Sequence, residues 1–424
     1  MPSPASSDHP LPSSEWSTFV WNTIIRCAPP LQALSIYAHS MLPSGARPNK
    51  FTFTFLLKAC LRAPAFSPLI HAHLAKLGLH PDPFLRSALI AAYAAAGRLP
   101  AALRVFHLFP HPDIVLRTAL VSAFASCGLP DAALQTFDEI PHPNPVSWAA
   151  LLSAYTRTGR HAEALSFFRR MRFAGAAPTE AALVSSLSSA AVLGALFDGQ
   201  RAHRDVVVYG KCLTPVLGTA LLAMYAKCGR IDSARRSFDE MPKRDQPAWA
   251  AMITALASHG RGEEALRLFD EMLGLGLIPD HVTYVGVLHA CSHAGLVDEA
   301  RGHFDKMVKV YGIEPRAEHY GCMVDVLGRA GLVEEAWAVA RRMPVAPDER
   351  VLKSLLSPSC ALGFVECAEW ATERLVAWDA GHASAYVLLS NMYAALGRWE
   401  DSARVRKLMR VRGVPKAPGC SAVD

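Results

Sequence analysis

Ten glycines recur along the chain at intervals of 31 to 36 residues, and no other feature constrains the fold as strongly. They are Gly97, Gly128, Gly159, Gly194, Gly229, Gly260, Gly295, Gly331, Gly363 and Gly397. Each separates two stretches whose apolar residues recur at helical spacing, such as WAALLSAYTRT before Gly159 and HAEALSFFRRM after it. Glycine adopts a positive φ at little cost, which suits a turn that ends one helix before the next begins. The spacing therefore predicts a series of helical hairpins.

The predicted hairpins follow one another without a linker. Their bounds are 18–49, 50–82, 83–113, 114–144, 145–179, 180–214, 215–245, 246–280, 281–316, 317–348, 349–382 and 383–416. Prolines at 178, 279, 315 and 347 end second helices, because proline removes a backbone donor and clashes with the preceding turn. A single hairpin cannot bury its apolar face alone, so neighbouring hairpins must stack. The sequence predicts an all-α solenoid of stacked helix-turn-helix repeats.

Composition is compatible with this fold and excludes few functions. Hydrophobic residues make up 51% of the 424 residues and charged residues 19%, which is enough apolar material for a core. The net charge of +6 permits nucleic-acid binding without indicating it. The ten cysteines include no Cys-x-x-Cys pair, which predicts reduced thiols that lie mostly in the core. No apolar run reaches about 18 residues, so we expect no membrane-spanning segment.

The repeat lengths resemble those of one plant protein family. Lengths that cycle through about 35, 35–36 and 31–32, with Pro-Asp or Pro-Asn endings, are similar to the pentatricopeptide repeats of the mixed P, L and S type. Residues 384–421 are very similar to the extension that follows the last repeat in the E subgroup. The resemblance implies a right-handed superhelical solenoid with about ten repeats over 18–348 and an E-type extension of two hairpins over 349–416. We expect 1–17 to be a disordered N-terminal segment, weak as a targeting signal, and 417–424 to be a short tail.

The resemblance also implies a function. Members of this subgroup are site-recognition factors for C-to-U editing of organellar transcripts, so we expect single-stranded RNA as the ligand and the mitochondrion, or else the chloroplast, as the location. The implied protein partners are a DYW-type cytidine deaminase and multiple organellar RNA editing factors, with the extension as a docking platform or only as a cap of the solenoid. An RNA stabilisation or splicing factor is one alternative. A peptide-binding scaffold like the tetratricopeptide repeat proteins is another.

The residues do not predict an enzyme. A zinc cytidine deaminase needs His-x-Glu together with Pro-Cys-x-x-Cys, because one imidazole and two thiolates hold the metal. His161-Ala162-Glu163 matches only the first half, and no Cys-x-x-Cys is present to complete it. We interpret this tripeptide as a solvated helix start and expect no metal, no cofactor and no deaminase domain in this chain. The deaminase would be a separate protein.

By resemblance, the fifth and last residues of a hairpin read one RNA base while the second residue packs on the face of the base. The pairs expected to read are Asn22/Asn49 for a pyrimidine, Ser87/Asp113 for G, Thr118/Asn144 for A and Thr219/Asp245 for G. Thr54, Asp82, Asp280 and Asp348 are weaker candidates, because their pairs lie in L-type or atypical hairpins or lack a polar fifth residue. The expected base-packing residues are Phe19, Phe51, Phe84, Val115, Val146, Val216 and Val282. Alternatively, these second residues pack against the preceding hairpin.

Overall fold

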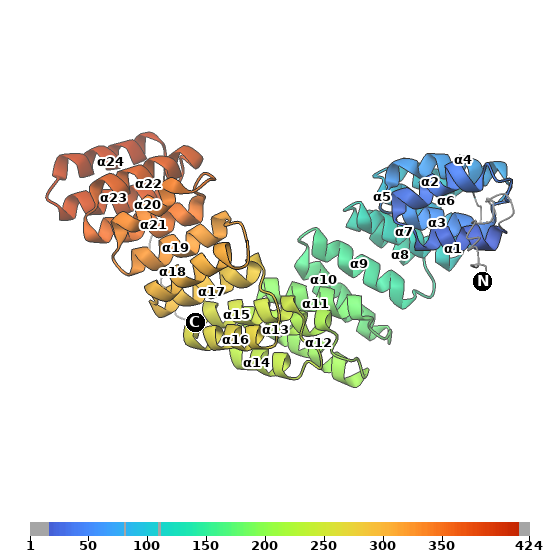
Figure 1. The fold of residues 1–424 in the computed structure, drawn as a ribbon, viewed down its shortest axis with the longest axis horizontal. Helices are drawn as coiled ribbons and strands as arrows, with labels where there is room; N and C mark the ends of the chain where they lie inside the picture. The colour runs from blue at the N-terminus through green and yellow to red at the C-terminus, as the bar shows by residue number, and fades with distance from the viewer. Residues whose placement is uncertain (1–16, 80–81, 109–111, 415–424) are drawn as a thin grey trace, which may run out of the picture. The chain divides into compact units, whose positions relative to one another are not determined.

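The computed structural model describes residues 17–79, 82–108 and 112–414, and over these ranges the chain is all-helical with no strand (Figure 1). The predicted fold of stacked helical hairpins is confirmed. The predicted tail 417–424, and all but Ser17 of the predicted N-terminal segment, lie outside the described residues.

Each hairpin has an odd-numbered first helix and an even-numbered second helix. The first helices are α1 (Thr18–Cys27), α3 (Lys50–Cys60), α5 (Pro83–Ala95), α7 (Ile114–Ser126), α9 (Pro145–Arg157), α11 (Glu180–Leu193), α13 (Pro215–Lys227), α15 (Gln246–Ser258), α17 (His281–Ala294), α19 (Ala317–Arg329), α21 (Glu349–Leu362) and α23 (Ala383–Ala395). Their starts coincide with the starts of the twelve intervals given above. How these intervals divide into RNA-reading repeats and an extension stays a prediction.

The second helices are α2 (Pro30–Ile36), α4 (Ser67–Lys76), α6 (Leu99–His107), α8 (Pro130–Asp138), α10 (His161–Phe173), α12 (Leu196–Val208), α14 (Ile231–Asp239), α16 (Gly262–Gly274), α18 (Val297–Lys309), α20 (Val333–Arg342), α22 (Val365–Trp378) and α24 (Trp399–Val411). A π-helical turn at Tyr37–Met41 extends α2, and a 3₁₀ turn at Pro64–Phe66 precedes α4. All ten glycines of the repeat spacing have positive φ, from 64° at Gly194 to 79° at Gly331. The local rule that predicted the turns therefore holds at every one of them.

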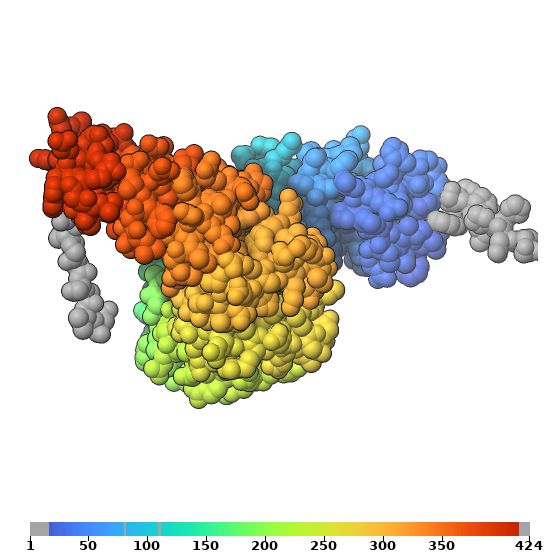
Figure 2. Space-filling model, turned by 60° about the vertical axis from the view of Figure 1, so that its left-hand side comes forward, coloured from blue at the N-terminus to red at the C-terminus, as the bar shows by residue number. Residues whose placement is uncertain are grey.

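The chain forms two compact units, Met1–Cys212 and Leu213–Asp424. Within each unit, first helices pack on the next first helix and on their own second helix, as α5 does on α7 and α6, and as α15 does on α17 and α16. Successive hairpins of one unit are in direct contact in the space-filling view (Figure 2). Large side chains such as Phe53 in the first unit and Trp249 and Tyr284 in the second are fully buried between these helices. Stacking thus supplies the core that a single hairpin lacks.

Two further predictions concern the burial of the cysteines and the presence of membrane-spanning segments. None of the nine described cysteines is in a disulfide; Cys60, Cys291 and Cys367 are buried, whereas Cys27 and Cys212 are exposed. The prediction that the thiols lie mostly in the core is therefore only partly right. Among the described helices, none combines the length and the apolar character that crossing a membrane requires.

Three partly or fully buried histidines lie in the second unit. Burial lowers the pKa of His289, His303 and His319 below the ordinary histidine value. His319 is completely buried, with Nδ1 accepting from the backbone N–H of Arg316 at 3.0 Å and Nε2 donating to the His281 carbonyl at 2.9 Å. Both ring nitrogens are used by a neutral imidazole, so protonation would break the contact to Arg316. The folded state thus disfavours the charged form of these three side chains.

We predict that the second unit loses stability as the pH falls below about 6.5, the ordinary histidine pKa. The unfolded chain takes up these protons at a higher pH than the folded chain does, so acid favours unfolding. The melting temperature of the wild-type protein should fall between pH 7.5 and pH 5.5, and His303→Leu should reduce that fall. His142→Gln, at an exposed site in the first unit, should behave as wild type. An equal pH dependence in the His303→Leu protein would contradict this assignment.

Candidate nucleic-acid interface

The second residue of each of the first ten first helices is exposed, although nine of the ten are apolar. The exposed fraction is 79% for Phe19, 75% for Phe84, and 60% for both Val146 and Val216. Phe51, Val115 and Val282 are also exposed, as are Ala181, Pro247 and Glu318. These side chains are therefore not buried against the preceding hairpin, which was the alternative interpretation. Regularly repeated apolar side chains in water are typical of a binding surface.

The last residue of a hairpin serves as the N-cap of the next first helix. The side-chain oxygen of Asp245 accepts from the Ala248 N–H at 3.1 Å, and that of Asn144 accepts from the Ser147 N–H at 2.8 Å. Asn49 and Asp113 cap α3 and α7 in the same way. Sequence reasoning assigned these residues only to base reading, although Asp or Asn before an apolar helix is the ordinary capping signal. Capping engages Oδ1, so in each aspartate the second carboxylate oxygen is left for a further contact.

Two of the four predicted pairs are joined by hydrogen bonds. Asn22 Nδ2 donates to Asn49 Oδ1 at 3.2 Å, and Asn144 Nδ2 donates to Thr118 Oγ1 at 3.4 Å. The structure therefore brings the fifth and last residues of these hairpins together. Asn22 is also the acceptor of a 2.6 Å bond from Thr52 Oγ1 and is only 8% exposed. Its amide is committed within the protein, which leaves Asn49 as the more accessible member of that pair.

The other two pairs are not joined directly by a hydrogen bond among the described residues. Ser87 Oγ donates to the Phe84 carbonyl at 2.9 Å within its own helix. Thr219 Oγ1 is buried and has no hydrogen-bond partner in the described part of the chain. A base could reach that hydroxyl only after side chains move. At this pair a base would therefore contact Asp245 before Thr219. Neither arrangement was evident from the sequence, because both depend on packing.

The weaker base-reading candidates also make hydrogen bonds that stabilise helices. Thr54 Oγ1 donates to the Lys50 carbonyl at 2.8 Å, one turn earlier in α3. The aspartates at the last position, Asp82, Asp280 and Asp348, cap α5, α17 and α21. Their second oxygens remain available, as in the stronger pairs.

Exposed basic side chains at or just beyond the ends of four first helices were missed by the sequence reasoning. Arg62, Arg157, Lys227 and Arg329 each follow the second residue of their hairpin by 11 positions and are exposed. Eleven residues make about three helical turns, so Arg157, Lys227 and Arg329 lie on the same helix face as the exposed second residue, whereas Arg62 lies two residues beyond the end of α3. The signal was the recurrence of a basic residue at this offset. Cations on the face that carries apolar side chains suit a polyanion with planar groups.

The His161-Ala162-Glu163 tripeptide lies at the start of α10, as interpreted from the sequence. Glu163 Oε1 accepts from Arg160 Nε at 2.9 Å, and this hydrogen bond lowers the pKa of the carboxylate. His161 Nδ1 lies 3.3 Å from Ser189 Oγ. Over residues 17–79, 82–108 and 112–414, no three His, Cys, Asp or Glu side chains are grouped in a way that could hold a metal.

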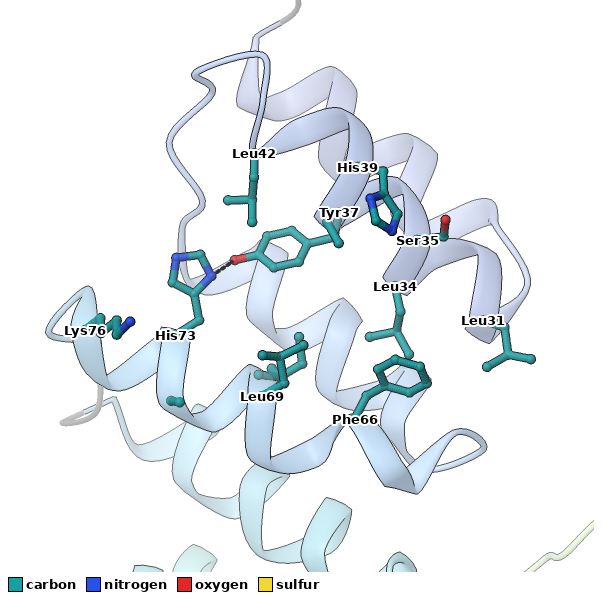
Figure 3. A pocket seen from close by; sticks show the side chains of 13 residues that line it. Leu31, Leu34, Ser35, Tyr37, His39, Leu42, Phe66, Leu69, His73 and Lys76 are labelled. Carbon is teal, nitrogen blue, oxygen red and sulfur yellow. Dashed lines mark hydrogen bonds between the residues drawn. The ribbon is translucent and has the colours of Figure 1, made fainter.

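An apolar cavity of about 550 Å³ lies between α2 and α4, on second helices of the first unit (Figure 3). Leu34, Leu69 and Phe66 form its apolar wall, and Tyr37 points across it to His73. The Tyr37 hydroxyl and His73 Nδ1 are 2.6 Å apart. None of the predicted RNA-contacting residues lines this cavity.

Comparisons with known proteins agree with the repeat pattern. A sequence model of the PPR repeat matches 86–109, 115–142, 146–175, 219–245, 282–310 and 318–346, a second PPR repeat family model matches 244–293, and an E motif model matches 364–424. The chain is 45% identical to the pentatricopeptide repeat-containing protein At3g62890 of Arabidopsis thaliana, over 96% of this chain and 74% of the relative. It is 36% identical to At1g59720, chloroplastic/mitochondrial, of the same plant, over 96% of this chain and 62% of the relative.

The chain spans 59 to 62% of the length of three other similar Arabidopsis relatives. Among solved structures, it is similar to the pentatricopeptide repeat protein PPR10 in complex with an 18-nt psaJ RNA element. The TM-score is 0.74 at 20% sequence identity, over 93% of this chain and 61% of PPR10. At this identity the likeness shows a shared fold.

We predict that Asp245→Ala lowers the free energy of unfolding by about 1 kcal/mol, because α15 loses its N-cap. Asp245→Asn should cost much less, since asparagine caps helices about as well as aspartate. Denaturant unfolding of the two variants against wild type measures the difference. Equal destabilisation by alanine and asparagine would show that the carboxylate has another structural role.

Proposed function

The chain belongs to the pentatricopeptide repeat family, and we propose that it binds single-stranded RNA in a sequence-dependent manner. The observation that carries the proposal is the row of exposed apolar second residues, each one turn or less from a polar N-cap residue. Phenylalanine side chains can stack on bases, and aliphatic side chains such as valine can pack on base faces, in both cases without regard to sequence, whereas carboxylate and amide groups distinguish one base edge from another. The solved complex of PPR10 with RNA supports this ligand class.

The basic side chains complete the proposed interface. Arg157 in the first unit, and Lys227 and Arg329 in the second, lie about 16 Å along the helix from the second residue, at 1.5 Å per residue, and Arg62 follows the end of α3. In our proposal these side chains contact phosphates, which positions the RNA but carries no sequence information. In these four hairpins, base reading and phosphate binding are thus assigned to opposite ends of the first helix.

We further propose that the chain recognises C-to-U editing sites in organellar transcripts and recruits a DYW-type deaminase in trans. The E motif match over 364–424 supports a role beyond RNA binding. Trp378 at the end of α22 and Trp399 at the start of α24 are 67% and 69% exposed, although tryptophan is usually well buried. Exposed aromatic side chains of this kind suit a protein partner. The mitochondrion is the proposed location, with the chloroplast as the alternative, in line with the name of one relative.

The first test is RNA affinity as a function of salt. Lys227→Ala should weaken binding to every RNA alike and reduce the slope of log affinity against log salt by about 0.7, the value for one single-strand phosphate contact. Lys309→Ala removes a lysine from the second helix α18 and should leave affinity and slope unchanged. An unchanged slope for Lys227→Ala would remove this residue from the interface.

Base reading is tested at one hairpin. Asp245→Asn keeps the N-cap but replaces an acceptor-only group with one that also donates, which recreates the Thr118/Asn144 type of pair. A mispaired base costs about 1–3 kcal/mol, so preference at the facing nucleotide should move from G toward A by roughly tenfold. Binding is measured on RNAs that differ only at that nucleotide.

The control for this substitution is Glu263→Gln on α16, which makes the same change in charge at an 82% exposed side chain on a second helix. It should not alter base preference. If Asp245→Asn retains the preference for G, or weakens every RNA equally, then Asp245 does not read a base.

Recruitment is tested separately from RNA binding. The double variant Trp378→Ala/Trp399→Ala should retain RNA affinity and lose editing when it replaces the gene product in the plant. Phe173→Ala, which removes an 87% exposed aromatic side chain at the end of α10, should support editing as wild type. Full editing by the double variant would leave the extension with the role of a cap. Lost transcript accumulation or splicing with intact editing would instead favour the alternative RNA function.

A further inference from the structure

The apolar cavity between α2 and α4 has the form of a groove, because one face of each helix lines it from end to end. Leu31 and Phe66 lie at one end, and Leu42 and Lys76 lie toward the other (Figure 3). The lining residues recur at helical spacing: Leu31, Leu34, Ala38 and Leu42 on α2 and its π-helical turn, and Phe66, Leu69, His73 and Lys76 on α4 and the preceding 3₁₀ turn. Ten residues of helix span about 15 Å at 1.5 Å per residue, so the groove is about three helical turns long.

The floor of the α2–α4 groove belongs to the core, whereas its walls are open to solvent. Leu34 and Ile70, on the floor, are buried in the core of the first unit. Leu31 is 65% exposed and Leu69 is 63% exposed, on opposite walls. Exposed apolar side chains that face one another over a buried apolar floor are typical of a site that another molecule covers.

The groove is open because the interaction that links other second helices is impossible here. Arg169 of α10 pairs with Asp198 of α12 at 2.7 Å, and Arg301 of α18 pairs with Glu335 of α20 at 2.6 Å. Neither α2 nor α4 contains an acidic residue, and the same is true of the π-helical and 3₁₀ turns beside them. No ion pair can therefore form between these two helices.

The two hairpins that form the groove are also strongly basic. Residues 18–82 contain six Lys or Arg and one acidic residue, Asp82, which gives +5 of the +6 net charge of the chain. That aspartate caps α5. The titratable side chains that line the groove are His39, His73 and Lys76, none of which is acidic. A partner that carries carboxylates beside an apolar surface would complement both the charge and the walls of the groove.

Other occupants fit these features less well. A second copy that bound through the same face would bring one basic surface against another. Nucleic acid matches the charge, but phosphates placed between leucine side chains would lose water without gaining partners. A bilayer suits apolar side chains that project outward, whereas those of Leu31 and Leu69 border a hollow of about 550 Å³. A groove three turns long between two helices is the usual receptor for an amphipathic helix with apolar residues at i, i+3 or i+4, and i+7.

We propose that the α2–α4 groove binds an acidic amphipathic helix of a protein partner. Its apolar face lies between Leu31 and Leu69, and its carboxylates lie near Lys76. None of the residues predicted to contact RNA lines this groove. The interaction therefore does not depend on the proposed RNA binding, and partner and RNA occupy different helices of the hairpins.

The test selects a ligand without assuming its sequence. The full chain is used to select from displayed random peptides of about 18 residues, which are long enough to exceed the groove as a helix. The Leu69→Glu protein serves to remove peptides that bind elsewhere. The peptides retained by wild type alone should have apolar residues at spacings of three and four and more acidic than basic residues. The most enriched peptide is then synthesised, and its affinity is measured by fluorescence anisotropy.

Leu69→Glu should weaken binding of this peptide by at least tenfold, because it places a carboxylate on an apolar wall. Lys76→Glu should weaken it by about fivefold, the scale of an exposed ion pair. Val207→Glu, which makes the same change at a 71% exposed side chain on the second helix α12, should bind the peptide as wild type does. Leu69→Glu should leave RNA affinity unchanged. Circular dichroism checks its fold, and Leu31→Glu on the opposite wall replaces it if it is unfolded.

Four results would overturn the inference. Wild type could retain no peptide beyond those that the Leu69→Glu protein binds, or it could retain basic peptides. Val207→Glu could weaken the peptide as much as Leu69→Glu does. Binding of wild type to vesicles of phosphatidylcholine and phosphatidylserine, lost in Leu69→Glu, would assign the groove to lipid. A dimer of wild type that Leu69→Glu dissociates would assign it to a second copy of the chain.

Discussion

The structure depends on one constraint, which is that a single helical hairpin exposes too much apolar surface to be stable by itself. First helices must therefore pack on first helices, as α15 does on α17 and α5 does on α7. Because neighbouring hairpins stack in the same register, the same position of each first helix recurs on one face of its compact unit. This is why the second residues of the first ten first helices are all exposed. A contact that one hairpin makes through its second residue can therefore be made at the next hairpin by a different side chain in the same position.

The same stacking gives the last residue of each hairpin two roles. It ends one hairpin, and it caps the first helix of the following one, as Asn144 and Asp245 do. Only Ser, Thr, Asp, Asn and Gly cap well, and most of these also carry the hydrogen-bonding groups that distinguish base edges. Capping therefore restricts the chemistry available for reading at this position. It also means that a substitution at Asp245 is informative about RNA only if the new residue still caps.

Much of this architecture could be predicted from the sequence because its determinants are local. A glycine with positive φ acts within its own turn, so Gly229 and its equivalents located ten of the twelve hairpins. The state of the fifth residues could not be predicted, because it depends on side chains about 30 residues away. Thr52 engages Asn22, and packing covers the hydroxyl of Thr219. The capping role and the basic residues were accessible from sequence, since both recur at a fixed offset, but attention to base reading alone overlooked them.

The boundary between repeats and extension is one of sequence similarity and need not be a boundary of function. α21 packs on α19 as other first helices pack on their predecessors, and its second residue occupies the register of the exposed second residues. What differs is chemistry, because Arg350 and Glu318 take the place of the apolar second residues of the other hairpins. A solenoid propagates geometry from each hairpin to the next, so a helix that continues the stack also continues the surface. Under the proposed function, the extent of the RNA-binding surface is then decided by the side chains in this register, such as Arg350 on α21 and Ser384 on α23, and not by where the extension begins.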